Sequence, residues 1–432
     1  MSNDALLFTF IFCAALVSSL LVRFYLASRQ IRHVMQHRDA VPPAFAHTIP
    51  LAAHQKAASY TTAKARLGLL QMAFGAAVLL GWTLLGGLNT LNQAISNLGL
   101  LSYGSLVPQL VLLAMFGLIS GVLDLPFTLY STFKLEERFG FNKTTLKLWV
   151  GDLLKSTAMG VVIGLPVVAL ILWLMASTGS LWWLWAWAAW MVFNLLALVL
   201  YPTVVAPLFN KFKPLDDEAL KARVTALMTR CGFAAKGLFV MDGSRRSAHA
   251  NAYFTGFGAA KRVVFYDTLL QQLNPGEVDA VLAHELGHFK HKHIIKRITI
   301  MFAMSLVGFA LLGWLASQTW FYTGLGVQPA LTGGNDALAL ILFMAVIPLF
   351  SFFISPLLAQ MSRAHEFQAD AYAISQTNSQ DLSAALLKLY QDNASTLTPD
   401  PLFAQFYYSH PPAQERLGRM AGWSTFSPAA VA

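Results

Sequence analysis

The sequence predicts a mainly α-helical protein that crosses a membrane seven times and carries a polar domain beside its membrane helices. Hydrophobic residues make up 56% of the 432 residues, above the roughly 45–50% of soluble domains, and the mean hydropathy is +0.54. A run of about 18 or more apolar residues marks a helix long enough to span a bilayer. Seven such runs occur, at residues 6–26, 67–88, 106–129, 157–175, 181–200, 298–315 and 337–358.

The first run, at residues 6–26, is expected to stay in the protein as a membrane anchor. Residues 1–5 contain an aspartate and neither lysine nor arginine, whereas a secretory signal peptide begins with a basic segment and ends at a small-residue cleavage site. We therefore count this run as a transmembrane helix.

The basic residues predict the orientation of these helices. The net charge is +9, and lysine and arginine concentrate in alternate connections between the runs. The connections at residues 92–105, 178–180 and 319–334 contain neither residue type. This is the positive-inside pattern, which places the N-terminus outside and the polar segments and the C-terminus in the cytoplasm. Topology therefore explains the positive charge, and no nucleic-acid partner is expected.

Polar sequence gathers in two stretches, residues 210–297 and 361–432, which the sixth and seventh runs separate. Because both stretches lie on the same expected side of the membrane, we predict one polar domain that a helical hairpin interrupts. The chain then divides into a membrane domain of five transmembrane helices at residues 1–205 and a second domain at residues 206–432, interrupted at about 298–358.

The second domain is predicted to contain a helix, two short strands and a second helix, in that order. The first helix covers residues 216–231, and the strands cover residues 238–241 and 262–266. The second helix begins within Leu-Asn-Pro-Gly-Glu at residues 273–277. There the asparagine is the N-cap, and the proline and the glutamate take the first and third helical positions.

This second helix carries a dense group of ionisable side chains, Ala-His-Glu-Leu-Gly-His-Phe-Lys-His-Lys-His at residues 283–293. His284 and His288 are four residues apart and share one face of the helix, so both imidazoles are able to bind one metal ion beside Glu285. His-Glu-x-x-His is the signature of zinc proteases, with two ligands and a general base. A polar helix face is the alternative, and the capped start of the helix favours the metal site.

A catalytic zinc ion needs a third protein ligand. The metzincin pattern is excluded, because His291 occupies its glycine position and Ile294 its histidine position. Glu366 and Asp370 are better candidates, since they lie one turn apart on a helix that continues from the seventh run. We expect Glu366 to ligate zinc and Asp370 to orient a ligand histidine through its second ring nitrogen. Two solvated acids are the alternative.

These motifs, the seven runs and four short stretches together resemble the type I CAAX prenyl endopeptidases, which are integral-membrane zinc proteases of the gluzincin type. The shorter heat-shock membrane proteases share the zinc motifs but lack the long amino-terminal membrane part. The four stretches are Phe-Gly-Phe-Asn-Lys-Thr (139–144), Pro-Leu-Phe-Asn-Lys-Phe (207–212), Asn-Ala-Tyr-Phe-Thr-Gly (251–256) and Ser-His-Pro-Pro (409–412).

The resemblance implies seven helices around a large chamber, with a zincin-like protease domain that carries a small β-sheet. It also implies one zinc ion per chain and the removal of three residues after a prenylated cysteine. By matched position, Asn251 contacts the substrate backbone on an edge strand, His410 lies near the scissile carbonyl and Arg416 lies close to the zinc site. Glu285 would move the proton of the attacking water to the leaving amine, and His410 would stabilise the oxyanion.

Three further histidines receive simpler interpretations. His291 and His293 are expected to form a basic helix face near the membrane. His249 either touches substrate or is structural.

Three ionisable residues lie in or beside the membrane runs. Asp152 and Lys155, three residues apart, are expected to pair on one helix face. Asp124 lies in the third run, where an ionisable group is a functional candidate by default.

Two classes of function remain open. The first is an enzyme that cleaves membrane-associated peptides, with either prenylated C-termini or misfolded and translocation-blocked proteins as substrates. The second is a non-catalytic scaffold that binds zinc and membrane lipid. Glu285 favours the enzyme, since a scaffold has no need of a carboxylate beside an open zinc position.

The expected location is a bacterial inner membrane, because the chain ends without a recognisable endoplasmic-reticulum retrieval signal. The endoplasmic-reticulum membrane is the alternative.

Overall fold

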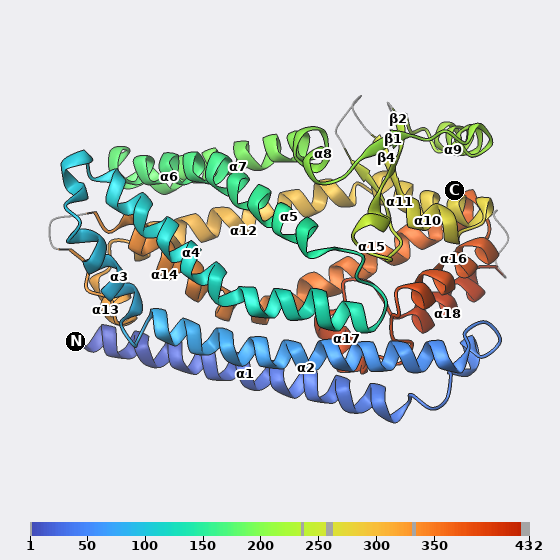
Figure 1. Ribbon diagram of the computed structural model, residues 1–432, viewed down its shortest axis with the longest axis horizontal. Coiled ribbons are helices and arrows are strands. Elements are labelled where there is room, and N and C mark those ends of the chain that lie inside the picture. The colour runs from blue at the N-terminus through green and yellow to red at the C-terminus, as the bar shows by residue number, and fades with distance from the viewer. Residues whose placement is uncertain (1, 235–236, 256–261, 331–333, 425–432) are drawn as a thin grey trace.

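The computed structural model describes residues 2–234, 237–255, 262–330 and 334–424. The protein is elongated, and its membrane helices run along its longest axis (Figure 1). The small β-sheet and the last helices of the chain lie together at one end, and the N-terminus lies at the other.

Seven helical segments among the described residues are long and apolar enough to cross a membrane, which confirms the predicted multi-pass membrane protein. Each predicted run overlaps one of these segments. The second run extends six residues past the end of its helix, and the fifth begins one residue before α7. The segments are α1 (Asn3–Gln36), α2 (Leu51–Trp82), α4 (Leu106–Tyr130) with its continuation to Glu136, α5 (Leu146–Met159) joined to α6 (Leu165–Ser177), α7 (Trp182–Leu200) with its continuation to Phe209, α12 (His293–Leu315), and α14 (Asp336–Ser351) joined to α15 (Ser355–Gln376).

The second run was expected to continue to residue 88, but α2 ends at Trp82. Gly86 adopts φ 81°, a left-handed conformation that is open to glycine and costly for most other residues. The chain turns there and begins α3 (Gly87–Ser96) in a new direction. Other short helices are α8 (Ala206–Phe209), α13 (Thr319–Thr323), α17 (Pro401–Tyr407) and α18 (Ala413–Ser424).

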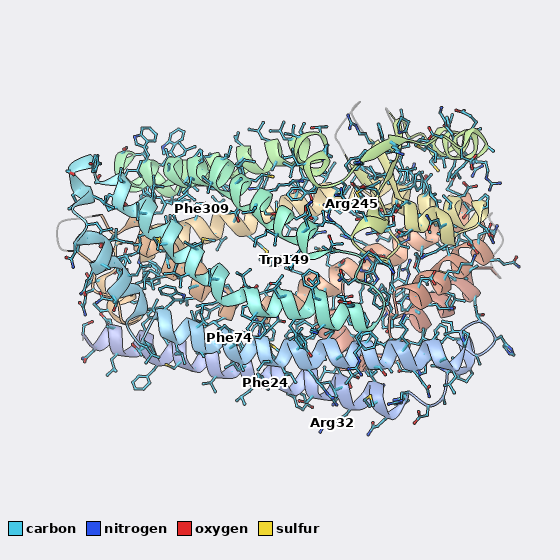
Figure 2. The ribbon with its side chains drawn as sticks, viewed as in Figure 1. Phe24, Arg32, Phe74, Trp149, Arg245 and Phe309 are labelled. Atoms are coloured by element: carbon cyan, nitrogen blue, oxygen red, sulfur yellow. The ribbon has the colours of Figure 1, made fainter. Side chains whose placement is uncertain are left out.

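One apolar core joins the membrane helices. Phe12 of α1, Leu112 of α4, Leu172 of α6 and Leu342 of α14 are buried in it. Other large apolar side chains of these helices remain exposed, among them Phe24 of α1 (Figure 2). A helix surface that faces lipid must expose apolar side chains, so this exposure agrees with a position in a bilayer.

The polar domain contains a mixed sheet of four strands in the order β1-β2-β4-β3. β2 pairs with β4 in parallel, whereas β1 and β3 pair antiparallel with their neighbours. β3 is therefore an edge strand. The two predicted strands correspond to β2 and β4. The strands are β1 (Phe212–Pro214), β2 (Gly237–Met241), β3 (Ala252–Thr255) and β4 (Arg262–Tyr266).

A second apolar core lies between this sheet and the helices that cover it. Val263 and Phe265 of β4 are fully buried there, together with side chains of the neighbouring helices. Those helices are α9 (Glu218–Arg230), α10 (Asp267–Gln272), α11 (Pro275–Lys290) and α16 (Ser379–Asp392).

Helix α11 starts as the sequence predicts. Asn274 is its N-cap and forms a capping box with Glu277, and Pro275 takes the first helical position. The helix ends at Lys290, and Lys292 then adopts a left-handed conformation with φ 56° before α12 begins at His293. This turn separates the polar domain from the sixth membrane segment within two residues.

Helices α11 and α15 pack closely against each other. A side chain on Gly287 of α11 would place its Cβ atom 2.9 Å from the Cα atom of Ala369 in α15, which is too close for two carbon atoms. Glycine at this position therefore allows the two backbones to approach.

The expected pairing of Asp152 with Lys155 is wrong. Asp152 and Lys155 both lie in α5, and each contacts a residue that lies farther along the chain instead. Arg246, which precedes β3, donates to both carboxylate oxygens of Asp152 at 2.9 and 3.0 Å. The ammonium group of Lys155 donates to the carbonyl of Leu208 at 2.8 Å. The bidentate arginine contact is the stronger geometry, and it ties α5 to the segment that leads into β3.

Candidate metal centre

Two helices bring the candidate metal ligands together. α11 carries His284 and His288, and α15 carries Glu366. The Nε2 atoms of the two histidines are 3.3 Å apart. Each lies 3.4 Å from a different carboxylate oxygen of Glu366, Oε2 for His284 and Oε1 for His288. The three predicted ligands therefore face one point.

The chemistry of these three side chains fits a metal ion. Glu366 is only 4% exposed, and its Oε2 atom has no hydrogen-bond partner among the described residues. A buried carboxylate oxygen without a partner costs free energy, and a cation between it and the two imidazoles removes that cost. The three side chains form a group able to hold a metal ion, and two imidazole nitrogens with one carboxylate are a ligand set of catalytic zinc.

Asp370 and Arg416 hold the first candidate ligand, His284. The Nδ1 atom of His284 lies 2.9 Å from Oδ1 of Asp370, as expected of a residue that orients a ligand histidine. Arg416 in α18 donates through Nε to Oδ2 of Asp370 at 2.8 Å and through Nη2 to Oδ1. Asp370 is fully buried and Arg416 is 8% exposed. Arg416 thus lies beside the candidate site, and its contact explains how a charged aspartate is kept in the interior.

The second ligand has a different partner, which the sequence did not reveal. The Nδ1 atom of His288 lies 3.0 Å from Nδ1 of His293, and Nε2 of His293 lies 2.8 Å from Oε1 of Gln368. His293 is 4% exposed, so it does not form a basic helix face with His291, which is exposed. His293 is buried because the left-handed turn at Lys292 ends the helix before it. The only sign of Gln368 in the sequence is its place two residues after Glu366.

Glu285 lies in a cavity beside the ligands. The cavity has a volume of about 150 Å³. Burial raises the pKa of Glu285 above the usual range of a glutamate. A carboxyl group with a raised pKa is a better acceptor for a proton from water. The lining includes Ala250, Asn251, Glu285, Glu366, His410 and Arg416.

His410 reaches the site from the loop between α17 and α18. Its Nε2 atom lies 3.5 Å from Oε1 of Glu366, and Ser409 Oγ lies 2.9 Å from its Nδ1 atom. Its side chain is 64% exposed, so the imidazole borders the open side of the cavity. The predicted position near a scissile bond is compatible with this placement.

Asn251 stands at the start of the edge strand β3. Its carbonyl accepts from the backbone N–H of Tyr266, and its side chain accepts from the N–H of Ala252. His249 lies two residues earlier, with Nδ1 at 3.1 Å from Oδ1 of Asn393. These contacts favour the structural interpretation of His249, which fixes the approach to β3, and leave Asn251 on the cavity.

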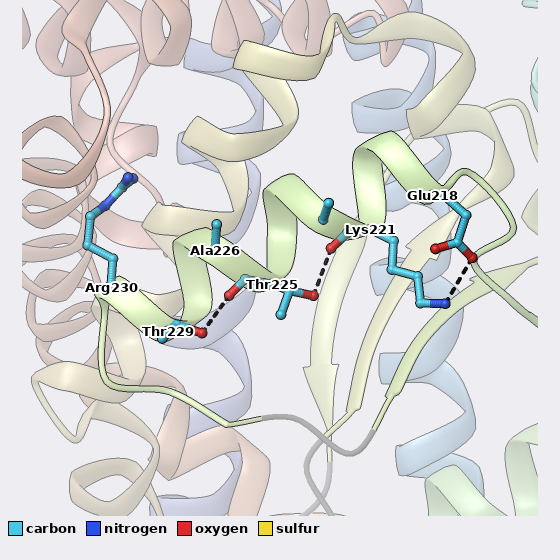
Figure 3. A pocket seen from close by; sticks show the side chains of 7 residues that line it. Glu218, Lys221, Thr225, Ala226, Thr229 and Arg230 are labelled. Carbon is cyan, nitrogen blue, oxygen red and sulfur yellow. Dashed lines mark hydrogen bonds and ion pairs between the residues drawn. The ribbon is translucent and has the colours of Figure 1, made fainter.

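A larger surface hollow lies on α9 and shares no lining residue with the metal-site cavity (Figure 3). Its polar side chains already have partners, either within α9 or, for Arg230, at the carbonyl of Gln376. Lys221 pairs with Glu218 at 3.1 Å, and the hydroxyl of Thr225 donates to the carbonyl of Lys221 at 2.7 Å. We assign no chemistry to it.

Removal of the Arg416 guanidinium is expected to destabilise the polar domain. Arg416→Ala leaves the buried carboxylate of Asp370 without its bidentate partner, and breaking a buried pair in this way costs about 3–5 kcal/mol. Arg419→Ala is the matched control on the same helix. Arg419 is exposed and lies over the ring of Phe367, a contact worth about 0.5–1 kcal/mol. Thermal unfolding in detergent should separate the two variants, and equal midpoints would contradict the interpretation of the Arg416 contact.

Two protein families match the chain over nearly its whole length. Residues 30–211 match the family described as CAAX prenyl protease N-terminal, five membrane helices. Residues 214–424 match peptidase family M48.

Curated relatives and a solved structure agree with these matches. CAAX prenyl protease 1 of Saccharomyces cerevisiae is 34% identical over 420 residues, which cover 91% of this chain and 90% of the relative. The CAAX prenyl protease 1 homologue of Homo sapiens is 32% identical and covers 91% of each chain. The crystal structure of S. mikatae Ste24p superposes with a TM-score of 0.90 at 31% identity, and covers 96% of this chain and 99% of that one.

Proposed function

Because the chain belongs to peptidase family M48, in the CAAX prenyl protease 1 group, we propose that it cuts prenylated proteins on the carboxyl side of the modified cysteine with the help of one zinc ion. The observation that carries the proposal is the convergence of His284 and His288 on the buried carboxylate of Glu366. Glu285 lines the same cavity.

The residues of the site have distinct proposed roles. His284, His288 and Glu366 hold the zinc ion, which when bound polarises the peptide carbonyl and acidifies water. Glu285 takes a proton from the water that attacks the carbonyl carbon, and delivers it to the nitrogen as the C–N bond breaks. His410 donates to the oxygen on which negative charge develops, a contribution of roughly 2.7–4 kcal/mol per donor in other enzymes.

The substrate backbone is proposed to lie along Asn251. β3 is an edge strand, and an extended peptide is able to add to such an edge through main-chain hydrogen bonds. Asn251 lines the same cavity as Glu285 and His410, so a peptide on this edge passes the catalytic groups. Arg416 also lines the cavity, and a contact with substrate remains part of the proposal for it.

The lipid of the substrate is proposed to lie in the chamber that the membrane helices are expected to enclose. A buried prenyl chain contributes about 0.8 kcal/mol per methylene. The names of the relatives, CAAX prenyl proteases, support this substrate class. An edge strand recognises backbone and not lipid, so unprenylated peptides should also be cut, but more slowly.

A comparison of three substrates tests the proposal. A farnesylated C-a-a-X peptide, the same peptide without farnesyl, and a membrane protein prone to misfold are incubated with the full chain, and Glu285→Gln protein serves as the blank. We expect release of the last three residues, fastest from the farnesylated peptide. Equal rates with and without farnesyl would replace the proposal with quality-control proteolysis, and no cleavage of any substrate would favour a zinc-binding scaffold.

The two parts of the chain and their orientation belong to the same proposal. We propose a membrane domain at residues 1–205 and a protease domain at residues 206–432 that the α12–α14 hairpin interrupts. The two family matches meet between residues 211 and 214, which supports a division near this point. The protease domain faces the cytoplasm and the N-terminus lies outside. Figure 1 shows α3, α13 and the N-terminus at one end and the sheet at the other.

Labelling of single cysteines tests this orientation, in a chain from which Cys13 and Cys231 have been removed. Positions in residues 92–105 and 319–330 should react from outside, and positions in 29–64 from the cytoplasm. Residues 331–333 of the expected outer connection lie outside the described residues. Cytoplasmic labelling at 319–330 would contradict both the orientation and the interrupted domain.

We propose that the chain lies in the endoplasmic-reticulum membrane and not, as the sequence suggested, in a bacterial inner membrane. The relatives named above come from eukaryotes, and they do not support a bacterial inner membrane. The endoplasmic-reticulum alternative agrees better with them, and fractionation of cells that produce the tagged chain would decide it.

A further inference from the structure

The second nitrogen of a metal-binding histidine decides how the ring is oriented and which tautomer it adopts. We propose that His293 and Gln368 form a positioning pair that fixes His288 for metal binding. This inference rests on the proposed zinc site and adds two residues to it.

The three side chains form a continuous line of hydrogen bonds. Nδ1 of His288 lies 3.0 Å from Nδ1 of His293, and Nε2 of His293 lies 2.8 Å from Oε1 of Gln368. Stacking on His365 holds the middle ring, because the two ring planes are nearly parallel and their centroids are 3.9 Å apart. The exposed ring of His291 lies farther away, with its centroid 5.5 Å from that of His293. His293 is buried, so water does not compete freely for either nitrogen.

The proton positions follow from the metal site. Nε2 of His288 faces Glu366 at 3.4 Å and must be free of a proton to bind a cation, so the proton of the neutral ring lies on Nδ1. That N–H donates to Nδ1 of His293, which must therefore accept. The proton of His293 then lies on Nε2 and donates to the carbonyl oxygen of Gln368. With the Gln368 oxygen facing His293, each donor in the line has one acceptor, and this arrangement favours the His288 tautomer that binds metal through Nε2.

The backbone explains why a residue five positions after His288 is able to reach it. On a continuous helix, residues three and four apart are neighbours, and a residue five apart lies off that face. Lys292 breaks the helix with φ 56°, and α12 begins at His293 in a new direction. After this turn, the ring of His293 lies beside the Nδ1 atom of His288.

The two ligand histidines are held in different ways. His284 contacts the carboxylate of Asp370, which Arg416 anchors, whereas His288 contacts a neutral histidine that a neutral amide anchors. A charged partner makes the ring a more basic ligand. Loss of Asp370 should therefore weaken metal binding more than loss of His293 does.

Two isosteric substitutions test the positioning role. The side-chain oxygen of asparagine occupies the place of Nδ1 in histidine, and the amide of glutamine reaches the place of Nε2. His293→Asn should keep the contact with His288, and His293→Gln should lose it. The measurement is the zinc dissociation constant of the detergent-solubilised full chain, by competition with a chelator. We expect it to rise about 10–100-fold in His293→Gln, the usual cost of losing such a partner, and less than about 3-fold in His293→Asn.

His291→Gln is the matched control, because this exposed ring stacks on His293 and its loss leaves the hydrogen bonds of His288 in place. Its dissociation constant should equal that of the unmodified chain. The inference is overturned if both His293 variants bind zinc as the unmodified chain does, or if asparagine is as damaging as glutamine. An unmodified chain that retains no zinc would instead refute the proposed function.

Discussion

Replacement of Glu285 by glutamine should abolish peptide cleavage and leave the metal in place. Glutamine has almost the same shape as glutamate but cannot accept the proton of water. A general base contributes about 10²–10⁴-fold to the rate, so cleavage should fall by at least that factor. His284, His288 and Glu366, which face one another at 3.3–3.4 Å, are untouched, and the zinc content should stay near one per chain.

The control is Glu415→Gln, which removes an exposed carboxylate next to Arg416 in α18. Its cleavage rate should match that of the unmodified chain. Single-turnover cleavage of the farnesylated peptide, together with metal analysis of the same samples, measures both quantities. Activity above about one hundredth of normal in Glu285→Gln would show that another group accepts the proton.

Glu366→Ala should lose both the metal and the activity. This change removes the carboxylate from the group of three side chains, and leaves two imidazoles from neighbouring turns of one helix. Loss of a direct ligand should exceed the roughly 10–100-fold that the loss of an outer partner costs in metal affinity. We expect zinc to be lost on dialysis against a weak chelator, and cleavage to fall to the level of Glu285→Gln.

Gln360→Ala, an exposed position of the same helix, serves as the control for α15. It should retain metal and activity. Stoichiometric zinc and normal cleavage in Glu366→Ala would mean that a different side chain completes the ligand set.

The group of candidate metal ligands was predictable because its signals are local. His284 and His288 share a helix face through their spacing, and a capped start at Asn274 fixes the helix that carries them. Glu366 and Asp370 repeat the same one-turn spacing. The membrane helices were predictable because the length of an apolar run is itself the requirement for spanning a bilayer.

The partners of these ligands depend on contacts between distant segments, and local patterns do not contain them. Asp152 was assigned to Lys155 three residues away, but it pairs with Arg246, 94 residues along the chain. His293 looked like one more basic residue because a left-handed lysine is rare and nothing in the sequence marks Lys292. Arg416 was placed near the site only through resemblance, since it meets Asp370 from another helix.

The order of the candidate metal ligands along the chain has a consequence for biogenesis. His284 and His288 are synthesised before the α12–α14 hairpin, and Glu366 is synthesised after it. A ribosome-bound chain therefore has an incomplete centre until both membrane segments have been inserted and α15 has folded back onto α11. We therefore expect a growing chain to be unable to cut its nascent neighbours before both membrane segments have been inserted. Chains released at increasing lengths should acquire chelator-resistant zinc only after α15 has been made.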